Sequence, residues 1–206
     1  MSETKEKILL TALHLFARDG YEAVSVSAIA GELGMTKGAL YRHYRSKRDI
    51  FDSIVERMYR VDAERSREFQ MPEQTFDVAP EAYRSATVTG IVGFTLDRFV
   101  FWTEDPFAAD FRKMLTLEQY RNPEMAQLYR GCLTEGPVAY MQDLFRELMG
   151  KGILKRSDPK QLAVSYYAPF YLLLGTYRDT EDRTAIELLK QHVDRFFREH
   201  LLHDFA

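Results

Sequence analysis

Residues 24–47 read V-S-V-S-A-I-A-G-E-L-G-M-T-K-G-A-L-Y-R-H-Y-R-S-K, and this stretch decides the fold of the N-terminal part of the chain. Ser25 can cap one short helix that ends at Gly34, and Thr36 can cap a second one that turns Leu40 inward. Each predicted helix has about two turns, and a tight turn joins them. This is the spacing of a helix-turn-helix.

Longer amphipathic segments flank this pair on both sides. Between residues 5 and 18, apolar side chains repeat every three or four positions, which predicts a helix that Gly20 stops. On the other side, Ser46 begins the sequence S-K-R-D, a capping pattern that opens a helix to about residue 69. The first seventy residues therefore predict four helices.

The rest of the chain has helical rather than strand periodicity. Residues 70–80 contain two prolines and no helical period, which predicts a loop. Further helices are expected at approximately 81–104, 106–120, 123–149, 159–178 and 181–203. Three of them begin with an Asx-Pro pair whose Asx side chain caps the helix: Asp105-Pro106, Asn122-Pro123 and Asp158-Pro159. Bends are expected at Gly136-Pro137 and at Pro169.

These segments together predict an all-α fold of about nine helices. We expect two domains. Residues 1–47 would form a three-helix domain that contains the helix-turn-helix, and residues 48–206 would form a larger helical body.

Charge is segregated toward the N-terminus. The formal net charge is −3, which is too small for a protein that coats nucleic acid or anionic membrane. Residues 1–50 nevertheless hold eight Lys and Arg against six Asp and Glu, whereas the other 156 residues hold 20 against 25. The second helix of the motif and its flank carry basic residues and no acidic one: Lys37, Arg42, Arg45, Lys47 and Arg48. This local field favours phosphate, so the motif is a candidate for the major groove of DNA.

Composition excludes several other classes of protein. A single cysteine, Cys132, rules out an intrachain disulfide and a multi-cysteine zinc site, so we expect a reducing compartment, the cytoplasm. The N-terminus shows no export signal. The most apolar later stretch, residues 168–175, has eight residues, whereas a membrane span needs roughly 20. We therefore expect no membrane partner, and nothing in the sequence indicates a cofactor.

Several residues of the N-terminal segment form a recognisable signature. They are Phe16-Ala17, Ile29-Ala30 with Gly34, Leu40-Tyr41-Arg42-His43-Tyr44 and Ser46-Lys47. With them, residues 5–58 closely resemble the TetR family of transcriptional regulators, and the helical remainder is compatible with that family. Gly31 departs from the pattern, because a polar helix former is usual there and glycine loosens a helix by up to ~1 kcal/mol relative to alanine.

The resemblance implies a set of DNA-contacting residues, which are Ser25, Ser27, Thr36, Lys37, Gly38, Ala39, Tyr41, Arg42, His43 and Lys47. Residues 36–39 would open the recognition helix and read bases. Lys37 would reach guanine O6 or N7, and the Ala39 methyl group would meet a thymine methyl group. Arg42 and Ser27 would touch either bases or backbone, and the sequence does not decide between them.

Phosphate contacts would fix the position of this unit without reading the sequence. Tyr41 and His43 would donate to phosphates, and Lys47 would pair with one at the start of the following helix. The Ser25 hydroxyl and its helix N-terminus would hold another. Tyr44 is expected to be core instead, because it lies on the inward face.

The resemblance also implies a homodimer, in which the last two helices pair with their symmetry mates. Candidate interface residues are Leu162, Leu173, Leu189, Val193, Phe196 and Phe197. A homodimer presents two recognition helices to successive major grooves, so the expected DNA partner is an inverted repeat. Packing of these stripes against the rest of the same chain is the alternative.

Residues 94–145 are rich in aromatic and methionine side chains, which suit an adaptable apolar pocket. The resemblance implies a small, mainly apolar or aromatic effector that releases a repressor from its operator. Candidate pocket residues are Phe99, Trp102, Phe111, Met114, Tyr140, Tyr166 and Phe170. Ordinary core packing is the alternative for this set.

Two other functions stay open at this point. The helical body could bind a protein partner rather than a small ligand, or the chain could be an all-helical enzyme, which needs a nucleophile, a metal or an acid/base pair. Only His200 and His203 lie one turn apart, close to the C-terminus. Cys132 is a lone thiol, and such residues are usually small buried hydrophobes. We therefore expect no catalytic residue and no metal.

Overall fold

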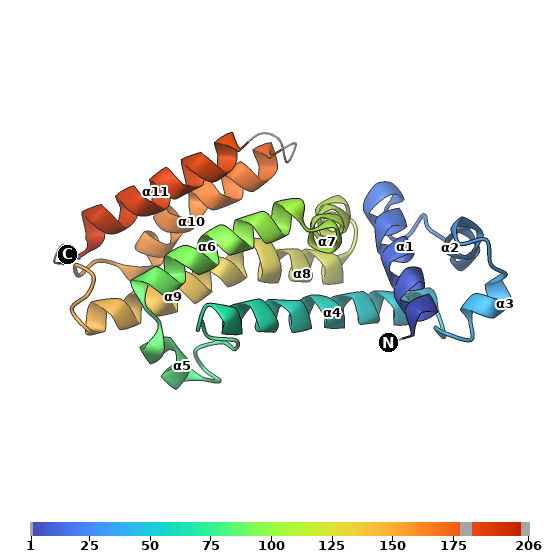
Figure 1. Ribbon diagram of the computed structural model, residues 1–206, viewed down its shortest axis with the longest axis horizontal. Coiled ribbons are helices and arrows are strands. Elements are labelled where there is room, and N and C mark those ends of the chain that lie inside the picture. Colours follow the sequence, from blue (N-terminus) through green and yellow to red (C-terminus); the bar gives the residue numbers. More distant parts are fainter. Residues whose placement is uncertain (1, 178–182, 203–206) are drawn as a thin grey trace. The chain divides into compact units, whose positions relative to one another are not determined.

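The computed structural model describes residues 2–177 and 183–202, and within these ranges the regular structure is helical. The helices are α1 (Glu3–Asp19), α2 (Val26–Glu32), α3 (Lys37–Leu40), α4 (Lys47–Glu68), α5 (Pro80–Ser85), α6 (Val88–Glu104), α7 (Pro106–Glu118), α8 (Pro123–Leu133), α9 (Glu135–Gly150), α10 (Pro159–Thr176) and α11 (Thr184–His200) (Figure 1). A single antiparallel bridge joins Leu154 and Leu201 in the described residues. The predicted all-α class is confirmed.

The chain forms two compact units that do not coincide with the expected domains at 1–47 and 48–206. Unit 1 comprises Met1–Val61 and Asp105–Tyr129, and unit 2 comprises Asp62–Glu104 and Arg130–Ala206. Helices α4 and α8 each contribute residues to both units. The helix-turn-helix segment therefore shares unit 1 with α7.

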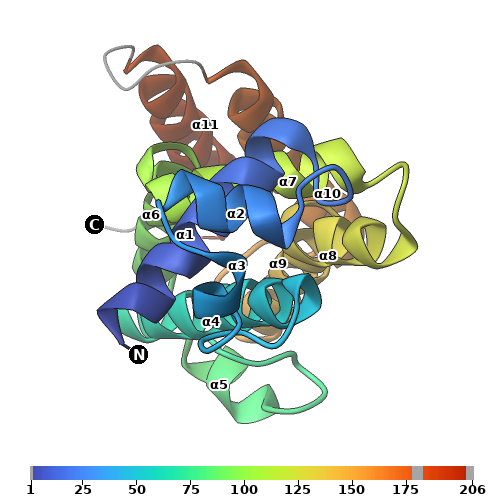
Figure 2. The same cartoon turned by 90° about the vertical axis from the view of Figure 1, so that its right-hand side faces the viewer.

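In unit 1, α1 packs on α7 and also contacts α2, which in turn contacts α3 (Figure 2). The apolar face that the periodicity of α1 predicts is buried: Ile8, Leu9, Ala12, Leu13 and Phe16. In unit 2, α10 contacts α6, α9 and α11 (Figure 1). No helix within the described ranges combines the length and the apolar character needed to cross a membrane.

The predicted helix starts are confirmed by hydrogen bonds from side chains to backbone. Asp105 accepts from the N–H of the third residue after it, Asn122 from those of the second and third, and Asp158 likewise, at 2.9–3.2 Å. Proline follows each of them at a position that needs no donor. The sequence predicts these helix starts because the capping atom and the backbone N–H group that it satisfies lie within three residues of each other.

The expected helix at 81–104 divides into α5 and α6. Ala86 is extended, with φ −61° and ψ 140°. The Thr87 hydroxyl accepts from the Gly90 N–H at 3.0 Å, and its carbonyl accepts from the Ile91 N–H at 3.0 Å. Thr87 therefore starts a new helix. Its side-chain hydroxyl accepts a hydrogen bond from a backbone N–H group in the first turn of α6, as the side chain of an N-cap residue does.

The expected helix at 123–149 divides at Thr134, three residues before Pro137 and not at the Gly136-Pro137 pair. Pro137 has no N–H for the Leu133 carbonyl, which lies four residues before it. That carbonyl accepts a hydrogen bond from the Tyr167 hydroxyl at 2.9 Å. The loss of one intrahelical bond is thus offset by a tertiary contact.

The boundaries of the last two helices lie close to the expected ones. Helix α10 ends at Thr176 and runs through Pro169, which lies inside it. Helix α11 spans Thr184–His200, while positions 181, 182 and 203 of the expected helix lie outside the described residues. The division of two expected segments raises the number of helices from about nine to eleven in the described part of the chain.

Candidate DNA-binding surface

The inward face of the helix-turn-helix is fixed by core packing. Ile29 and Leu40 have no exposed surface, and Tyr44 is 1% exposed. The Tyr44 hydroxyl donates to the Lys5 carbonyl at 3.2 Å, and burial raises the pKa of Tyr44 to about 12. The assignment of Tyr44 to the core is correct, and its ring anchors the end of the motif to α1.

The opposite face carries the predicted DNA-contacting residues. The exposed ones are Ser25, Ser27, Thr36, Lys37, Gly38, Tyr41 and Arg42, and the half-buried ones are Ala39, His43 and Lys47. Ser25 and Thr36 cap α2 and α3, since their hydroxyl oxygens accept from the Ala28 and Ala39 N–H groups at 3.0 and 3.2 Å. A hydroxyl that accepts in this way keeps its own O–H to donate to a phosphate.

The recognition helix is shorter than the expected two turns. Regular α-helix covers only Lys37–Leu40, and Tyr41 to His43 continue as a turn. This turn is closed by the His43 N–H, which donates to the Leu40 carbonyl at 2.9 Å. The positions that we expect to read bases therefore lie in one helical turn.

Lys47, which the sequence assigns to a phosphate at the start of α4, is held by groups of its own unit. Its ammonium donates to the carbonyl oxygens of Tyr21 at 2.8 Å and Glu22 at 3.4 Å. It also lies 4.3 Å from the centre of the Tyr21 ring, and its side chain is 22% exposed. The sequence could not show this, because Tyr21 lies 26 residues earlier in the chain.

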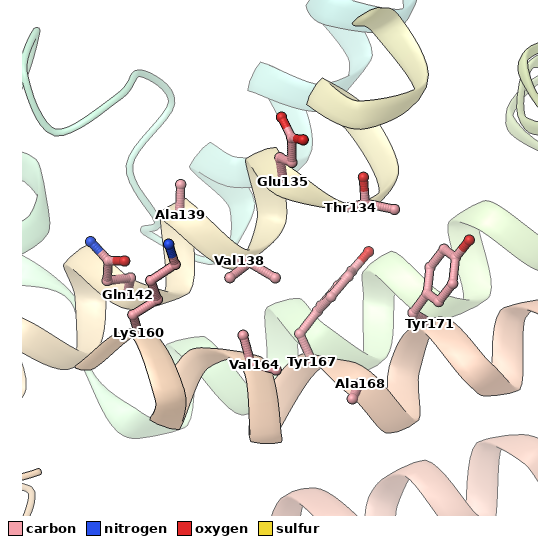
Figure 3. Close-up of a pocket in the computed structure, with 10 residues that line it drawn as sticks. All are labelled: Thr134, Glu135, Val138, Ala139, Gln142, Lys160, Val164, Tyr167, Ala168 and Tyr171. Carbon is pink, nitrogen blue, oxygen red and sulfur yellow. The ribbon is translucent and has the colours of Figure 1, made fainter. Parts of the chain in front are cut away.

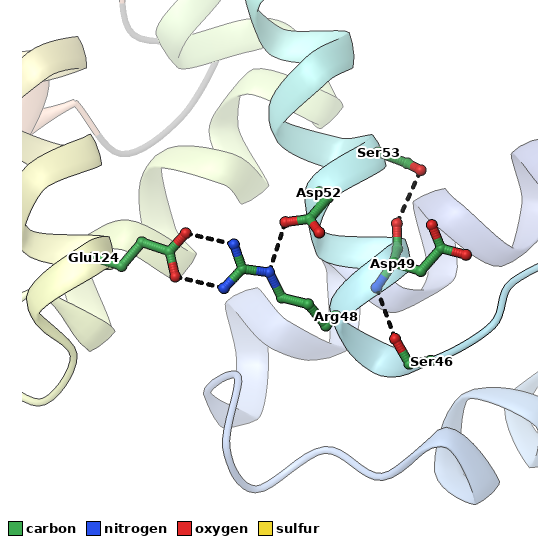
Figure 4. Close-up of polar contacts among 6 residues, drawn as sticks. All are labelled: Ser46, Arg48, Asp49, Asp52, Ser53 and Glu124. Atoms are coloured by element: carbon green, nitrogen blue, oxygen red, sulfur yellow. Dashed lines mark hydrogen bonds and ion pairs between the residues drawn. The ribbon is translucent and has the colours of Figure 1, made fainter.

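Arg48 is also occupied, as Figure 4 shows. Its Nη1 and Nη2 atoms contact the two carboxylate oxygens of Glu124 at 2.6 and 2.7 Å, and its Nε atom contacts Asp52 at 2.7 Å. Ser46 caps α4 through the Asp49 N–H at 3.0 Å, and the Asp49 carboxylate accepts from the Arg45 N–H at 2.8 Å. This is the predicted capping pattern, with the returning bond placed one residue earlier.

Carboxylates offset the charge of two of the five basic side chains, since Lys47 lies 3.9 Å from Glu22 and Arg48 is paired with Glu124. Lys37, Arg42 and Arg45 are exposed and take part in no ion pair in the described part of the chain. The Lys37 ammonium lies 5.7 Å from the centre of the Tyr41 ring. These three side chains are available to phosphates or base edges.

The predicted effector pocket residues are core residues in this structure. Tyr140 is half-buried and the other six are at most 4% exposed. Phe111 and Met114 belong to unit 1, whereas the remaining five belong to unit 2. Several are packed ring against ring, such as Phe99 against Phe170 at 5.5 Å between centroids. These residues are therefore packed as an ordinary core, which is the alternative given for them in the sequence analysis.

A pocket of about 520 Å³ lies elsewhere in unit 2, between α9 and α10. Its lining residues are Thr134, Glu135, Val138, Ala139, Gln142, Lys160, Val164, Tyr167, Ala168 and Tyr171 (Figure 3). Apolar side chains line its middle, Lys160 and Gln142 lie toward one end, and Glu135 lies toward the other. None of the seven predicted residues lines it. Tyr167, one of the lining residues, donates a hydrogen bond to the Leu133 carbonyl at 2.9 Å.

The predicted dimer residues are largely covered by their own chain. Leu162, Leu189, Val193, Phe196 and Phe197 are at most 4% exposed, and Leu173 is half-buried. The stripe on α11 packs within unit 2, where Phe196 lies 5.5 Å from Phe145 and 4.8 Å from Tyr166. Side chains buried in this way cannot form the surface that a second chain meets.

Other apolar side chains of α10 and α11 are exposed instead. Val164, Tyr171 and Leu172 of α10 are 47%, 41% and 66% exposed, and Leu188 of α11 is 48% exposed. Tyr171 and Leu172 follow Val164 by seven and eight residues, which is about two helical turns, so the three lie on one side of α10. We call these four residues the α10–α11 strip.

The remaining candidates for a catalytic or metal-binding role are weak. Burial raises the pKa of the Cys132 thiol to about 12, which leaves almost no thiolate at neutral pH. His200 hydrogen-bonds the Phe196 carbonyl at 2.7 Å through Nδ1, and His203 lies outside the described residues. Within the described residues no three His, Cys, Asp or Glu side chains gather as a metal site would require.

Comparison with known proteins finds a family model that matches the N-terminal segment. Residues 8–54 match the family model of bacterial regulatory proteins, tetR family. The N-terminal segment of the chain is therefore similar to the tetR family. The transcriptional repressor BepR of Brucella suis biovar 1 is 43% identical over 56 residues, which are 27% of this chain and 27% of BepR. The curated relatives that this chain matches are covered over 19–30% of their own lengths.

The whole chain resembles TetR-type structures in fold. SmeT, the repressor of the Stenotrophomonas maltophilia multidrug efflux pump SmeDEF, is 20% identical with a TM-score of 0.64, over 97% of this chain and 91% of SmeT. SmeT in complex with triclosan also matches, with the same TM-score. A regulator from Saccharomonospora viridis in complex with choline is 20% identical with a TM-score of 0.67, over 99% and 100% of the two chains. The proteins named in this comparison are described as regulators or repressors.

Proposed function

We propose that this chain is a ligand-responsive transcriptional repressor of the cytoplasm that binds an inverted-repeat operator as a homodimer. One observation carries the DNA-binding part. The helix-turn-helix buries Leu40 and Tyr44 while it exposes Lys37, Arg42 and Arg45 without ion pairs in the described residues. A basic face opposite a rigid apolar one is what major-groove binding requires.

Selection of DNA tests this function directly. The purified protein is mixed with sheared genomic fragments at about 0.15 M salt, where weak nonspecific binding is suppressed. We expect enrichment of an inverted repeat by the wild-type protein and its loss in a Lys37→Ala, Arg42→Ala variant. Arg198→Ala is the matched control, because it removes an exposed positive charge from α11. Equal enrichment by all three proteins, or none by the wild type, contradicts the proposal.

We propose the α10–α11 strip as the dimer surface in place of the buried residues that the sequence suggested. Leu172 is the most exposed member, so Leu172→Glu places a charge where a second copy would pack. Val78→Glu is the control, since Val78 is equally exposed at 66% but belongs to the segment before α5. Sedimentation should show a monomer for the first variant and a dimer for the second.

We propose that the effector binds in unit 2, in the pocket between α9 and α10. Its volume lies in the range of about 300–1,000 Å³ that is usual for small-ligand sites, and its middle is apolar. Structures of similar fold hold triclosan or choline. Native mass spectrometry of the purified protein, followed by titration with triclosan and with choline, tests this proposal. Ala139→Trp should fill the pocket from α9 and abolish binding.

A protein partner is the second candidate for the body, and one observation favours it. Val164 and Tyr171 belong both to the pocket lining and to the α10–α11 strip, so the pocket opens onto an apolar surface. Ala139→Trp leaves that strip intact. If Ala139→Trp loses ligand binding but remains a dimer, ligand binding and dimerisation are separate roles of the body. If triclosan and choline bind the wild-type protein no better than they bind Ala139→Trp, the result favours the protein partner.

A further inference from the structure

Glu118, the last residue of α7, is a buried carboxylate that the proposed function does not use. Its side chain is 2% exposed. Oε1 accepts a hydrogen bond from the Tyr21 N–H at 2.9 Å, whereas Oε2 is buried and has no hydrogen-bond partner in the described residues. Charged side chains are almost never buried so deeply unless they are paired, so this placement requires an explanation.

The turn between α1 and α2 is built closely around this carboxylate. Gly20 has φ +90°, and a Cβ atom at this position would lie 2.7 Å from Glu118 Oε1. Glycine accepts both the dihedral angle and the close approach, which no other residue does without strain. Gly20 and Glu118 therefore fix the backbone of the turn, and with it the position of Tyr21.

The same turn holds the ammonium group of Lys47. The carbonyl oxygens of Tyr21 and Glu22 accept its hydrogen bonds, and the Tyr21 ring lies below it with 4.3 Å between the ammonium and the ring centre. The Tyr21 ring is itself packed against Phe16 and Phe51, at 5.0 and 5.3 Å between centroids. A lysine ammonium has three N–H donors, so two carbonyl contacts leave the third for a phosphate oxygen. The Glu22 carboxylate, 3.9 Å from the ammonium, is exposed and would have to give way to that phosphate.

We propose that Glu118 is a positioning residue for the phosphate contact of Lys47. It fixes the Tyr21 backbone, and the Tyr21 carbonyl and ring hold the Lys47 side chain where a phosphate can meet its remaining N–H. This inference rests on the proposed DNA binding and extends its machinery to the end of α7. A side chain ordered in advance loses less entropy on binding, which for one lysine corresponds to about threefold to tenfold in affinity for each half-site.

Substitutions at Glu118 test the inference with the full chain and the DNA fragment that the wild-type protein selects. Glu118→Leu removes the acceptor for the Tyr21 N–H, so DNA affinity should fall about threefold to tenfold for each half-site. Glu118→Gln keeps a carbonyl acceptor and should retain affinity within about twofold. Leu115→Ala, a buried change in the same helix, should lower thermal stability without lowering DNA affinity. All affinities are measured well below the melting temperatures of the variants.

A double-mutant cycle with Lys47→Met separates positioning from general loosening. If Glu118 acts through Lys47, Glu118→Leu should have no further effect on DNA affinity in the Lys47→Met background. Additive effects would overturn the inference, as would a Glu118→Gln variant that binds DNA as weakly as Glu118→Leu.

Hydrogen exchange of the Tyr21 amide gives a readout that needs no DNA. It should be faster in Glu118→Leu than in the wild type and Glu118→Gln, because the Tyr21 N–H has lost its partner. Unchanged exchange would overturn the inference by itself. Failure of the wild-type protein to select DNA, together with faster exchange in Glu118→Leu, would instead contradict the proposed function.

Discussion

Arg48 and Glu124 form a two-pronged ion pair in unit 1, with nitrogen–oxygen distances of 2.6 and 2.7 Å. The pair joins the first turn of α4 to the first turn of α8, and it is reinforced by Asp52 on the side of Arg48 (Figure 4). A planar guanidinium bound through two nitrogens to one carboxylate fixes orientation as well as distance. The pair therefore ties the residue after Lys47 to the helical body of its own unit.

Because Arg48 is occupied, we expect it to contribute little to the salt dependence of DNA binding. Arg42→Gln should lower the slope of log affinity against log salt by about 1 for each half-site, whereas Arg48→Gln should leave that slope nearly unchanged. Titrations between about 0.05 and 0.3 M salt measure both slopes. An equal loss for the two variants would mean that DNA displaces Glu124 from Arg48.

Two glycines of the motif should respond to alanine in opposite ways. At Gly31 a Cβ atom would meet, beyond its chain neighbours and its own helix backbone, no atom of the described residues within 4 Å, so Gly31→Ala should stabilise the protein by up to ~1 kcal/mol. At Gly20 the positive φ and the nearby Glu118 make Gly20→Ala destabilising by more than about 1 kcal/mol. Urea unfolding of both variants checks this. Stabilisation by Gly20→Ala would contradict the geometry of the turn.

The Cys132 thiol should be unreactive near neutral pH. Burial raises its pKa from 9.0 to about 12, and the thiolate is the nucleophile. Alkylation by iodoacetamide at pH 8 should therefore be far slower in the folded chain than in the chain unfolded in urea. The thiol's contribution to stability is fully present below pH 9, and it is lost as the pH rises from 9 toward 12, because the unfolded chain ionises first. Equal alkylation rates at pH 8 would show that the thiol is exposed.

A buried hydroxyl pair stabilises unit 2. The Thr95 hydroxyl donates to the Ile91 carbonyl at 2.8 Å, so in its 2.7 Å contact with Tyr166 it is the acceptor. Thr95→Val would leave the buried Tyr166 O–H without a partner, and we expect a loss of about 1–3 kcal/mol in unfolding free energy.

Tyr166→Phe is the matched comparison, because it leaves only an acceptor unpaired and should cost less than Thr95→Val. The double variant should lose less than the two single losses together. Thermal and urea unfolding measure all three, and simple additivity would mean that the two hydroxyls do not interact.

Much of the local structure was predictable because its causes are local. Ser25, Thr36, Asp105 and Asp158 cap the helices that the sequence assigns to them, each through backbone donors within three residues. The apolar face of α1 is buried as its periodicity predicts. The sequence placed the break between α8 and α9 at Gly136-Pro137 instead of Thr134. The Leu133 carbonyl accepts its hydrogen bond from the Tyr167 hydroxyl, 34 residues away, and the local sequence does not show this contact.

The candidate site was predicted in part. Exposure of Lys37 and Arg42 follows from the helix-turn-helix pattern, since Leu40 and Tyr44 must face the core. The pocket was not predicted, because aromatic residues that suit a pocket suit a core equally well, and in this chain they form the core. The predicted dimer residues are buried for the same reason. The periodicity of an amphipathic helix shows that its apolar face is covered, but it does not show whether the same chain or a second chain covers it.

The sequence by itself determined the all-α class, the helix starts and the signature of the recognition motif, because each depends on residues a few positions apart. Only the tertiary structure decided which charges are free and which apolar faces are covered. Lys47 is held by Tyr21, which lies 26 residues away, and Arg48 by Glu124, 76 residues away. Ion pairing and burial depend on neighbours that distant segments supply, and those neighbours exist only once the chain has folded.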